Sequence, residues 1–433
     1  MIEDFSWGYS QSQLKDLGAQ HTAREIAQQP QLWLDTYHLL LQQQDKIQHF
    51  LNGIYDQDKL RIILTGAGTS AYIGNILQGS FQQQLSHPVF AVATTDLVSH
   101  PHLYLFSSTP TLLISFARSG NSPESLAAID LADQFCKSCH HLLITCNAGG
   151  QLALESKNIN NRLLFILPPE AEDKSLAMTG SFTAMLLTGM LLPRLHELNK
   201  LGQQIQILAQ HGMWILSNYS AQLREIAKLN FQRAVFLGSG PLLGTARECQ
   251  LKLQELTDGK VICTYESFLG FRHGPKAVID TNTLLVYLFT NNVYAHQYEI
   301  DLVNSIKKNE KGVYQLGIFK TKEDTCDLDT EIILSDKAFD LEEEFLAVCY
   351  VLPAQILGFY KSINLGLKPD LPSVSISRVV QGVKIYPLTN GNSIETTNHS
   401  HENAGCDRGR RTEPGHHHER DSGFPVHWKR NTC

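Results

Sequence analysis

The stretch Arg61-Ile-Ile-Leu-Thr-Gly-Ala-Gly-Thr-Ser70 decides the fold. Its first half is a short apolar run, which is typical of a strand buried on both faces, and Gly66 and Gly68 end that run. A helical pattern begins at Ser70. A strand, a glycine turn and a helix in this order predict one unit of a parallel α/β sheet.

The same theme recurs along the chain. Residues 233–240 (RAVFLGSG) form a second strand and glycine turn, and a helix is expected over residues 244–257. Further strands are expected at residues 88–94, 111–116, 141–146, 163–167, 260–263, 283–289, 313–318 and 331–334. Further helices are expected at residues 123–136, 175–229 (interrupted near Gly202) and 341–364. The alternation predicts an α/β protein with two domains, each a mainly parallel sheet flanked by helices in a doubly wound arrangement.

Changes in composition suggest the domain limits. We expect an N-terminal helical segment over residues 1–45, in which Thr22-Ala-Arg-Glu25 resembles a capping box and Pro30 marks a helix end. A first sheet domain over residues 46–214 and a second over residues 215–389 follow. Residues 390–433 are polar and without periodicity, so they are interpreted as a disordered tail, including His416 to His418.

Composition and charge argue against several classes of protein. Of 433 residues, 42% are hydrophobic and 18% charged, and the net charge is -7, which disfavours a nucleic-acid binder. The N-terminus has no signal-peptide pattern and no apolar run reaches membrane length, so a cytoplasmic protein is expected. The nine cysteines are interpreted as reduced and mostly buried. Cys136-Lys-Ser-Cys139-His140 matches a haem-attachment spacing, but the export signal is lacking; no metal or cofactor is expected.

Two loops indicate an anion site. Residues 66–70 and residues 118–122 (Arg-Ser-Gly-Asn-Ser) follow neighbouring strands, contain glycine and hydroxyl side chains, and lead into helix N-termini. Exposed N–H groups and the helix dipole favour an anion there. A simple helix cap at Ser122 is an equally good interpretation of the second loop. Neither loop matches a P-loop or a dinucleotide fingerprint, so a small-molecule monophosphate fits best.

The acid–base candidates lie in the second half. Glu248, Lys252 and Glu255 share one helical face, which from periodicity alone favours a solvated salt-bridge stripe. The following segment holds His273 between Arg272 and Gly-Pro in a loop-like stretch. A histidine near a carboxylate forms a plausible proton-transfer pair, although a lone loop histidine is more often merely exposed.

These motifs together resemble a known family, the tandem sugar-isomerase (SIS) domains. They occur in the isomerase half of glutamine–fructose-6-phosphate aminotransferase and in related deaminases. Within this family, the chain most resembles the galactosamine-6-phosphate deaminases, also described as tagatose-6-phosphate ketose/aldose isomerases. The motifs are TAREIAQQP (22–30), GAGTS (66–70), SFARSGNSPES (115–125), LGSG (237–240), LKLQEL (251–256), ESFLGFRHGPK (266–276) and RVVQGVKIYPL (378–388).

The resemblance implies roles for individual residues. Ser70, Ser119 and Ser122 would bind the substrate phosphate, Glu255 would move a proton between C1 and C2, and His273 would assist ring opening. In the family this histidine reaches the neighbouring subunit's site, which implies a homodimer or larger homo-oligomer. Lys252 would support Glu255 or a developing oxyanion. The remaining phosphate-binding candidates are Gly68, Thr69, Arg118 and Gly120.

Several differences from the aminotransferase sequence determine which reaction we expect. No glutaminase domain and no Cys after Met1 are present, so glutamine is not expected as the nitrogen source. Gln381 stands where the aminotransferase has its Schiff-base lysine, although Lys384 is close, and Arg118 follows Ala117 where an additional serine is usual. We expect galactosamine 6-phosphate to give tagatose 6-phosphate and ammonium. Glucosamine-6-phosphate deamination, a plain ketose/aldose isomerase and a non-catalytic sugar-phosphate sensor are the alternatives.

Overall fold

The computed structural model describes residues 7–309, 314–321, 326–335, 341–373 and 383–388. The chain divides into a unit of residues 1–385 and a second unit of residues 386–433. The expected tail at 390–433 lies outside the described residues, and all that follows concerns the first unit.

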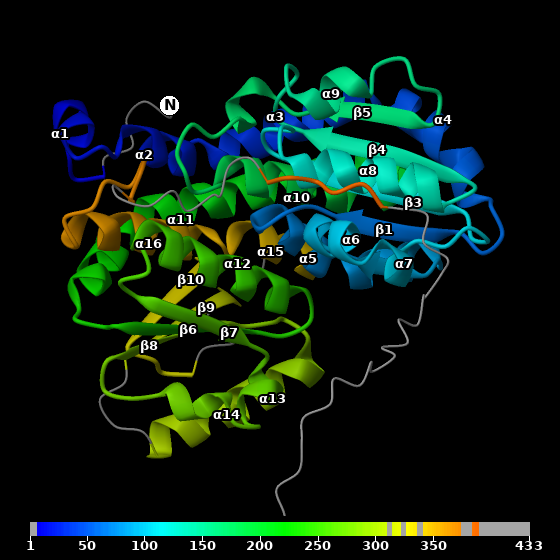
Figure 1. The fold of residues 1–433 in the computed structure, drawn as a ribbon. Coiled ribbons are helices and arrows are strands. Elements are labelled where there is room, and N and C mark those ends of the chain that lie inside the picture. The colour runs from blue at the N-terminus through cyan, green and yellow to red at the C-terminus, as the bar shows by residue number, and fades with distance from the viewer. Residues whose placement is uncertain (1–6, 310–313, 322–325, 336–340, 374–382, 389–433) are drawn as a thin grey trace, which may run out of the picture. The chain divides into compact units, whose positions relative to one another are not determined.

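Two five-stranded parallel sheets form the framework, as the sequence predicted (Figure 1). In both, the strand that precedes the glycine turn pairs with two neighbours, and every pairing is parallel. The first sheet has the order β2 (Val89–Ala91), β1 (Arg61–Thr65), β3 (Thr111–Ala117), β4 (Cys139–Thr145) and β5 (Arg162–Ile166). The second has the order β10 (Thr330–Ser335), β9 (Tyr314–Thr321), β8 (Thr283–Leu288), β6 (Arg233–Gly238) and β7 (Ile262–Glu266).

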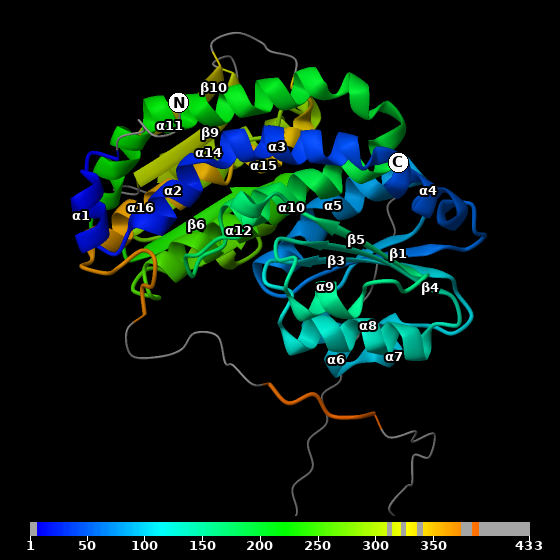
Figure 2. The same cartoon turned by 90° about the horizontal axis from the view of Figure 1, so that it is seen from above.

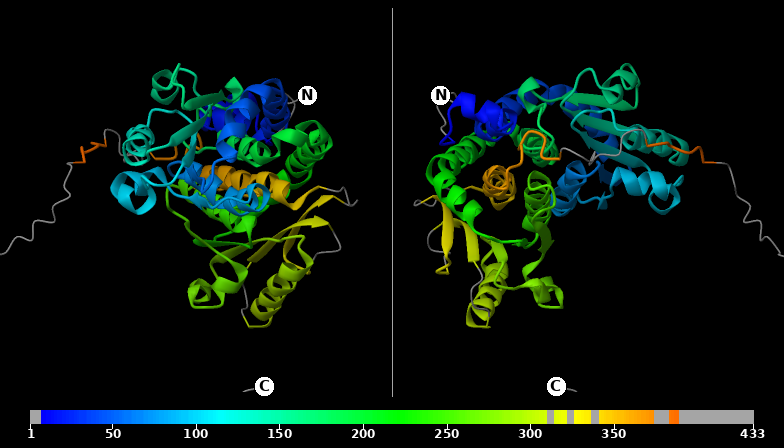
Figure 3. Two further views of the ribbon diagram at one scale, coloured as in Figure 1. Left: turned by 90° about the vertical axis from the view of Figure 1, so that its right-hand side faces the viewer. Right: turned by 60° about the vertical axis from the view of Figure 1, so that its left-hand side comes forward.

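Both faces of each sheet are covered by helices. Ile62 and Leu64 of β1 pack into the large central core, whereas Ile63 packs into a separate cluster on the opposite face. Seen from above, four helices lie along that outer face of the first sheet (Figure 2): α6 (Thr94–Ser99), α7 (Pro101–Tyr104), α8 (Pro123–Phe135) and α9 (Gln151–Glu155). The outer face of the second sheet carries α13 (Phe268–Phe271) and α14 (Val293–Asn309), as the views in Figure 3 show.

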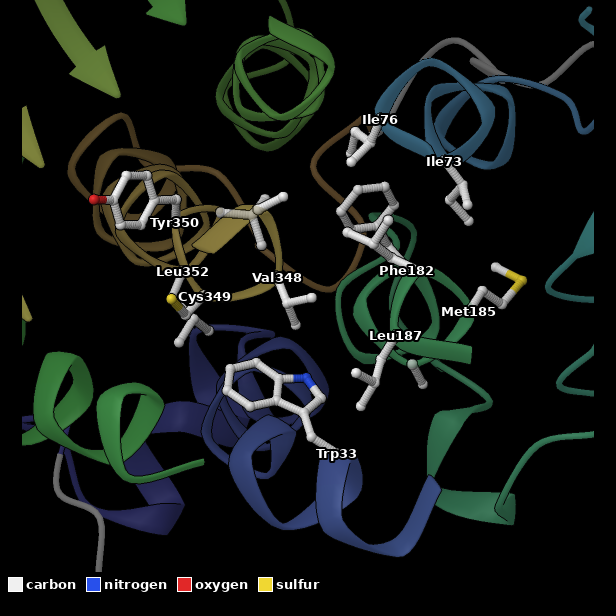
Figure 4. Packing of buried hydrophobic residues seen from close by; sticks show 14 of the residues in the cluster. Trp33, Ile73, Ile76, Phe182, Met185, Leu187, Val348, Cys349, Tyr350 and Leu352 are labelled. Atoms are coloured by element: carbon white, nitrogen blue, oxygen red, sulfur yellow. The ribbon is translucent and has the colours of Figure 1, made fainter. Parts of the chain in front are cut away.

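A layer of helices between the two sheets holds the common core. Figure 4 shows Trp33, Ile73 and Phe182 from three different helices, together with Tyr350 from the turn between α15 and α16, in this core. Because these side chains are almost completely buried, the two sheets share one hydrophobic interior. The helices of this layer are α3 (Gln29–Gln42), α5 (Thr69–Leu85), α10 (Gly180–Leu191), α11 (Gly202–Lys228), α12 (Pro241–Leu256), α15 (Glu343–Cys349) and α16 (Leu352–Asn364).

The remaining helical pieces connect these layers. The chain begins with α1 (Gln11–Asp16) and α2 (Gln20–Ala27), and α4 (Gln44–Tyr55) precedes β1. Three short 3₁₀ segments complete the chain: η1 (Pro169–Ala171), η2 (Leu192–Lys200) and η3 (Pro275–Val278). Helix α11 runs continuously through residues 214 and 215, and the domain limits given above stay a prediction.

The expected capping box at Thr22 and Glu25 is wrong. Helix α2 begins at Gln20, so both residues lie inside it. Its first N–H groups are capped from far away in sequence: the Asp370 carboxylate accepts from Thr22 N at 2.7 Å and His21 N at 3.2 Å. A genuine capping box forms instead at Ser10 and Gln13 in α1.

Two further differences concern apolar and amphipathic helices. Helix α14 (Val293–Asn309) was not expected from the sequence. Among the described residues, the segment Glu343–Asn364 is long and apolar enough to span a membrane by length and composition. Its apolar window is 94% buried inside the fold, which is typical of a core helix. The cytoplasmic location stays a prediction.

Candidate functional site

The first glycine turn brings the backbone into a tight approach at the end of β1. A Cβ atom on Gly66 would lie 2.6 Å from the Ser70 carbonyl carbon, and Gly68 has φ +57°. Only glycine tolerates both conditions, so the chain can turn directly into α5, whose first residues Thr69 and Ser70 are buried. The turn after β6 has the same construction, with Gly240 at φ +54°, which confirms the internal repeat.

The second loop lies next to the first. Strand β3 pairs with β1, so the loops that follow them leave the same edge of the sheet. Gly120 has φ +62°, and the Ser119 hydroxyl accepts from Asn121 N at 3.3 Å. Ser122 caps α8 by accepting from Ser125 N at 3.2 Å, so the helix-cap interpretation is confirmed. Phosphate binding at these serines stays a prediction.

Helix α12 carries a buried ionic network rather than a solvated stripe. Glu248 and Lys252 are completely buried, and the Glu255 side chain is 29% exposed. Lys252 Nζ lies 2.8 Å from Glu255 Oε2 and 3.3 Å from Glu248 Oε1. The expectation of a salt-bridge stripe in solvent was therefore wrong, because α5 and α16 pack over this helix. Buried charges of this kind must be paired, and here they are.

The network joins the two halves of the fold. Lys252 Nζ donates to Thr69 Oγ1 at 3.1 Å, and Thr69 Oγ1 lies 3.4 Å from Glu248 Oε1. Thr69 is the first residue of α5, directly after the glycine turn of the first sheet. The expected acid–base residues and the expected phosphate loop therefore meet, although they are far apart in the sequence.

The charges of this network are set by burial. Burial raises the pKa of Glu248 to about 8, and nearby Glu255 acts in the same direction, although Lys252 opposes both. The two carboxylates raise the pKa of Lys252 even though burial lowers it. At neutral pH this arrangement favours a protonated Glu248 beside a charged Lys252.

Glu248→Gln tests this proton assignment. As pH rises from about 4.5 to about 8, the unfolded chain releases the Glu248 proton before the folded protein does. The folded state therefore loses stability across this window, and glutamine removes that loss. We expect the free energy of unfolding, measured by urea titration at several pH values, to fall less steeply with pH in Glu248→Gln. Parallel profiles for the two proteins would contradict the assignment.

His273 lies on the surface. It follows α13, its backbone N–H donates to Gly270 O at 2.9 Å, and its side chain is exposed. The structure describes Lys384, whereas Gln381 lies outside the described residues. The roles predicted for His273 and for the C-terminal segment therefore stay predictions.

The sequence did not reveal the loop of residues 172–179 as part of the site. The Arg118 guanidinium donates to the carbonyl oxygens of Ser175 and Leu176, each at 3.2 Å, so it orders this loop. Glu25, buried in α2, accepts from Lys174 N at 2.5 Å and Ser175 N at 3.3 Å. Burial raises the pKa of Glu25, and Asp173 adds to that effect. No local signal pairs Glu25 with a loop about 150 residues later.

Two more contacts fix the same loop. The Asp173 carboxylate accepts from Thr179 N at 2.7 Å and from Ser181 N at 2.9 Å, which caps α10 from six to eight residues before it. Leu176 N donates to Asp370 O at 3.0 Å. Asp370, whose carboxylate caps α2, therefore also holds the loop of residues 172–179. The loop is thus held by an N-terminal helix, a C-terminal segment and a side chain of the first sheet.

Asp173→Ala is expected to destabilise the protein by about 3 kcal/mol, because it leaves several buried N–H groups without acceptors. Asp35→Ala, at a residue that accepts from exposed Gln31, serves as the control and should change little. The free energy of unfolding from urea titration gives both values. A loss below about 1 kcal/mol for Asp173→Ala would contradict the buried cap.

Comparison with known proteins shows which proteins share this sequence and fold. The family model described as SIS domain matches residues 54–193. The D-galactosamine-6-phosphate deaminase AgaS of Shewanella sp. (strain ANA-3) is 42% identical over 395 residues, covering 89% of this chain and 97% of the relative. The protein of that name from Escherichia coli is 38% identical, covering 84% and 95%. A crystal structure of tagatose-6-phosphate ketose/aldose isomerase from Escherichia coli has a TM-score of 0.78 at 36% identity, covering 84% of this chain and 96% of that one.

Proposed function

The chain belongs to the SIS-domain family that includes the D-galactosamine-6-phosphate deaminases, and we propose that it converts galactosamine 6-phosphate and water into tagatose 6-phosphate and ammonium. The observation that carries the proposal is the contact of Lys252 with both Thr69 and Glu255. It brings a charged carboxylate to the loop that is suited to an anion. A phosphorylated sugar held at that loop would present its carbon atoms to a base.

The phosphate end of the substrate is assigned to the first sheet. Ser70, Ser119 and Ser122 would donate hydroxyl protons to the phosphate oxygens, with Thr69 beside them. The turns at Gly68 and Gly120 keep backbone N–H groups accessible at helix N-termini. Arg118 contributes positive charge nearby while its guanidinium holds the loop of residues 172–179.

Proton transfer is assigned to Glu255. After ring opening, the Glu255 carboxylate takes the C2 proton of the open-chain amino sugar, and a proton is returned to C1. The product is a C2 imine, to which water adds; loss of ammonia then leaves the 2-ketose. Lys252, 2.8 Å from Glu255, holds the carboxylate in place and offers a positive charge to a developing oxyanion.

The direct test is ammonium release from galactosamine 6-phosphate and, in parallel, from glucosamine 6-phosphate. Rapid release from the galacto epimer alone is the expected result. Release from the gluco epimer alone would reassign the sugar. Interconversion of tagatose 6-phosphate with its aldose, without ammonium release, would identify a plain isomerase. Binding of both amino-sugar phosphates without any turnover would identify a sensor.

We further propose that His273 completes the site of a neighbouring subunit in a homodimer or larger assembly, since it is exposed and lies in the connection between β7 and β8 of the second sheet. His273→Ala and Glu255→Gln should each be nearly inactive alone. When the two variants are unfolded together and refolded as a mixture, a shared site predicts recovery of roughly a quarter of the parent activity. If each site uses its own His273, the mixture should stay as inactive as its components.

A further inference from the structure

Four side chains of metal-binding type gather where α8 ends and β4 begins. The sequence Asp133-Gln-Phe-Cys136-Lys-Ser-Cys139-His-His141 places them within nine residues. Strand β4 starts at Cys139, so the group lies at the amino edge of the first sheet. The glycine turn and the phosphate loops leave the opposite edge, and the proposed reaction uses none of these four residues.

The ligand atoms are close together, and the cysteine and histidine side chains are buried, whereas Asp133 is exposed. A carboxylate oxygen of Asp133, the Cys139 sulfur and a ring nitrogen of His141 all lie within 4.8 Å of one another. Cys136 lies outside this close group, but it is buried, stands three residues before Cys139 and has a thiol that interacts with the Cys139 thiol, which makes it the candidate for a fourth ligand. Cys136 is 5% exposed, Cys139 8% and His141 0%.

Neighbouring contacts orient these ligands. Arg162 donates to Asp133 Oδ2 at 2.7 Å, which leaves Oδ1 on the side of His141, 2.8 Å from its Nε2. Asn161 donates to the Cys139 carbonyl at 3.0 Å. His141 Nδ1 is buried and has no hydrogen-bond partner among the described residues. Such second contacts hold metal ligands in place in known sites.

The donor set selects a class of metal. Two sulfurs, one imidazole nitrogen and one carboxylate oxygen suit Zn²⁺, whereas Mg²⁺ and Ca²⁺ prefer oxygen ligands alone. Two thiolates and one carboxylate carry three negative charges, which Zn²⁺ and the Arg162 guanidinium together would balance.

We propose that Asp133, Cys136, Cys139 and His141 form a zinc site that fastens the end of α8 to strand β4. The site is structural, because α8 has 13 residues and separates it from Ser122 by about 20 Å. The haem-type spacing noted in the sequence would have used His140. In the fold, however, His140 lies beside Gln57, with 3.4 Å between their Nε2 atoms, and it is His141 that joins the cysteines.

Cobalt substitution tests this proposal on the full chain. The protein is freed of metal by a chelator under a non-thiol reductant and titrated with Co²⁺, which reports its ligands by absorption. Tetrahedral sites give strong visible bands, and thiolate ligands add a near-ultraviolet charge-transfer band. We expect one Co²⁺ per chain with the charge-transfer band, and displacement of Co²⁺ by Zn²⁺. The histidines at 416–418 can bind Co²⁺ too, but without thiolate absorption.

Cys139→Ser and His141→Asn are expected to weaken binding at this site at least about tenfold. Cys263→Ser, at a cysteine that is equally buried in the second sheet, is the control and should bind as the parent does. Zn²⁺ should also raise the melting temperature of the parent and of Cys263→Ser, but not of Cys139→Ser. If Cys139→Ser does not fold, Co²⁺ binding by Asp133→Asn and the absorption spectrum of the Co²⁺-loaded parent still test the site. A parent spectrum without thiolate absorption, or equal losses in Cys139→Ser and Cys263→Ser, would overturn the site.

Discussion

Glu255→Gln is expected to lower kcat for ammonium release by roughly 10²–10⁴-fold while KM stays within a few-fold of the parent value. Glutamine fills the same space but accepts no proton, so C2 deprotonation loses its base. The fold should tolerate the change. Because Glu255 helps to raise the pKa of Glu248, its removal makes Glu248 easier to ionise, and Lys252 then keeps a charged partner.

Steady-state kinetics of ammonium release provide the measurement. Glu225→Gln is the matched control, because Glu225 is an exposed carboxylate in the last turn of α11 and is paired with Lys228 instead of with the buried network. Its kcat should equal that of the parent. A Glu255→Gln enzyme within a few-fold of the parent would show that another group removes the proton, and Glu248 would become the next candidate.

Lys252→Met is expected to have the largest effect on stability. It leaves the mostly buried Glu255 carboxylate without its cation, and removing one partner of a buried ion pair costs about 3–5 kcal/mol. Activity should fall as well, because a developing oxyanion loses the positive charge of Lys252. Urea unfolding measures the first effect and ammonium release the second.

A second substitution separates the two effects. Lys252→Met combined with Glu255→Gln removes the carboxylate that has lost its cation, so it should recover much of the lost stability but not the activity. Lys228→Met breaks an exposed pair and should cost less than about 1 kcal/mol. If Lys252→Met were as stable as Lys228→Met, the buried network would not be the charged pair described above.

The sequence predicted those parts of the fold whose causes are local. Strand β1 and the turn at Gly66 and Gly68 were recognised because apolar residues and glycines stand next to one another. The start of α2 was not, because Asp370 caps it from about 350 residues away. A capping box was therefore assigned to Glu25, whose true partner is the loop at Ser175.

The site was predicted in part for the same reason. Helical spacing placed Glu248, Lys252 and Glu255 on one face, but spacing does not show what covers that face. Two close contacts between helices bury this face. A Cβ on Gly244 would lie 2.6 Å from Ile76, and one on Gly358 would lie 2.7 Å from Leu256. These contacts bring α5 and α16 against α12 and exclude water from the network.

The contacts of Asp370 also have a consequence for the order in which the protein folds during its synthesis. Asp370 bonds the backbone at Gly18, caps α2 and holds Leu176, so the loop beside the site gains its last support from a residue late in the chain. During synthesis on a ribosome, the first sheet can form early, yet this loop cannot be completed until residue 370 has emerged. The loop beside the site is therefore completed only after most of the described fold has been synthesised, and a chain truncated before residue 370 should be inactive because it lacks these contacts.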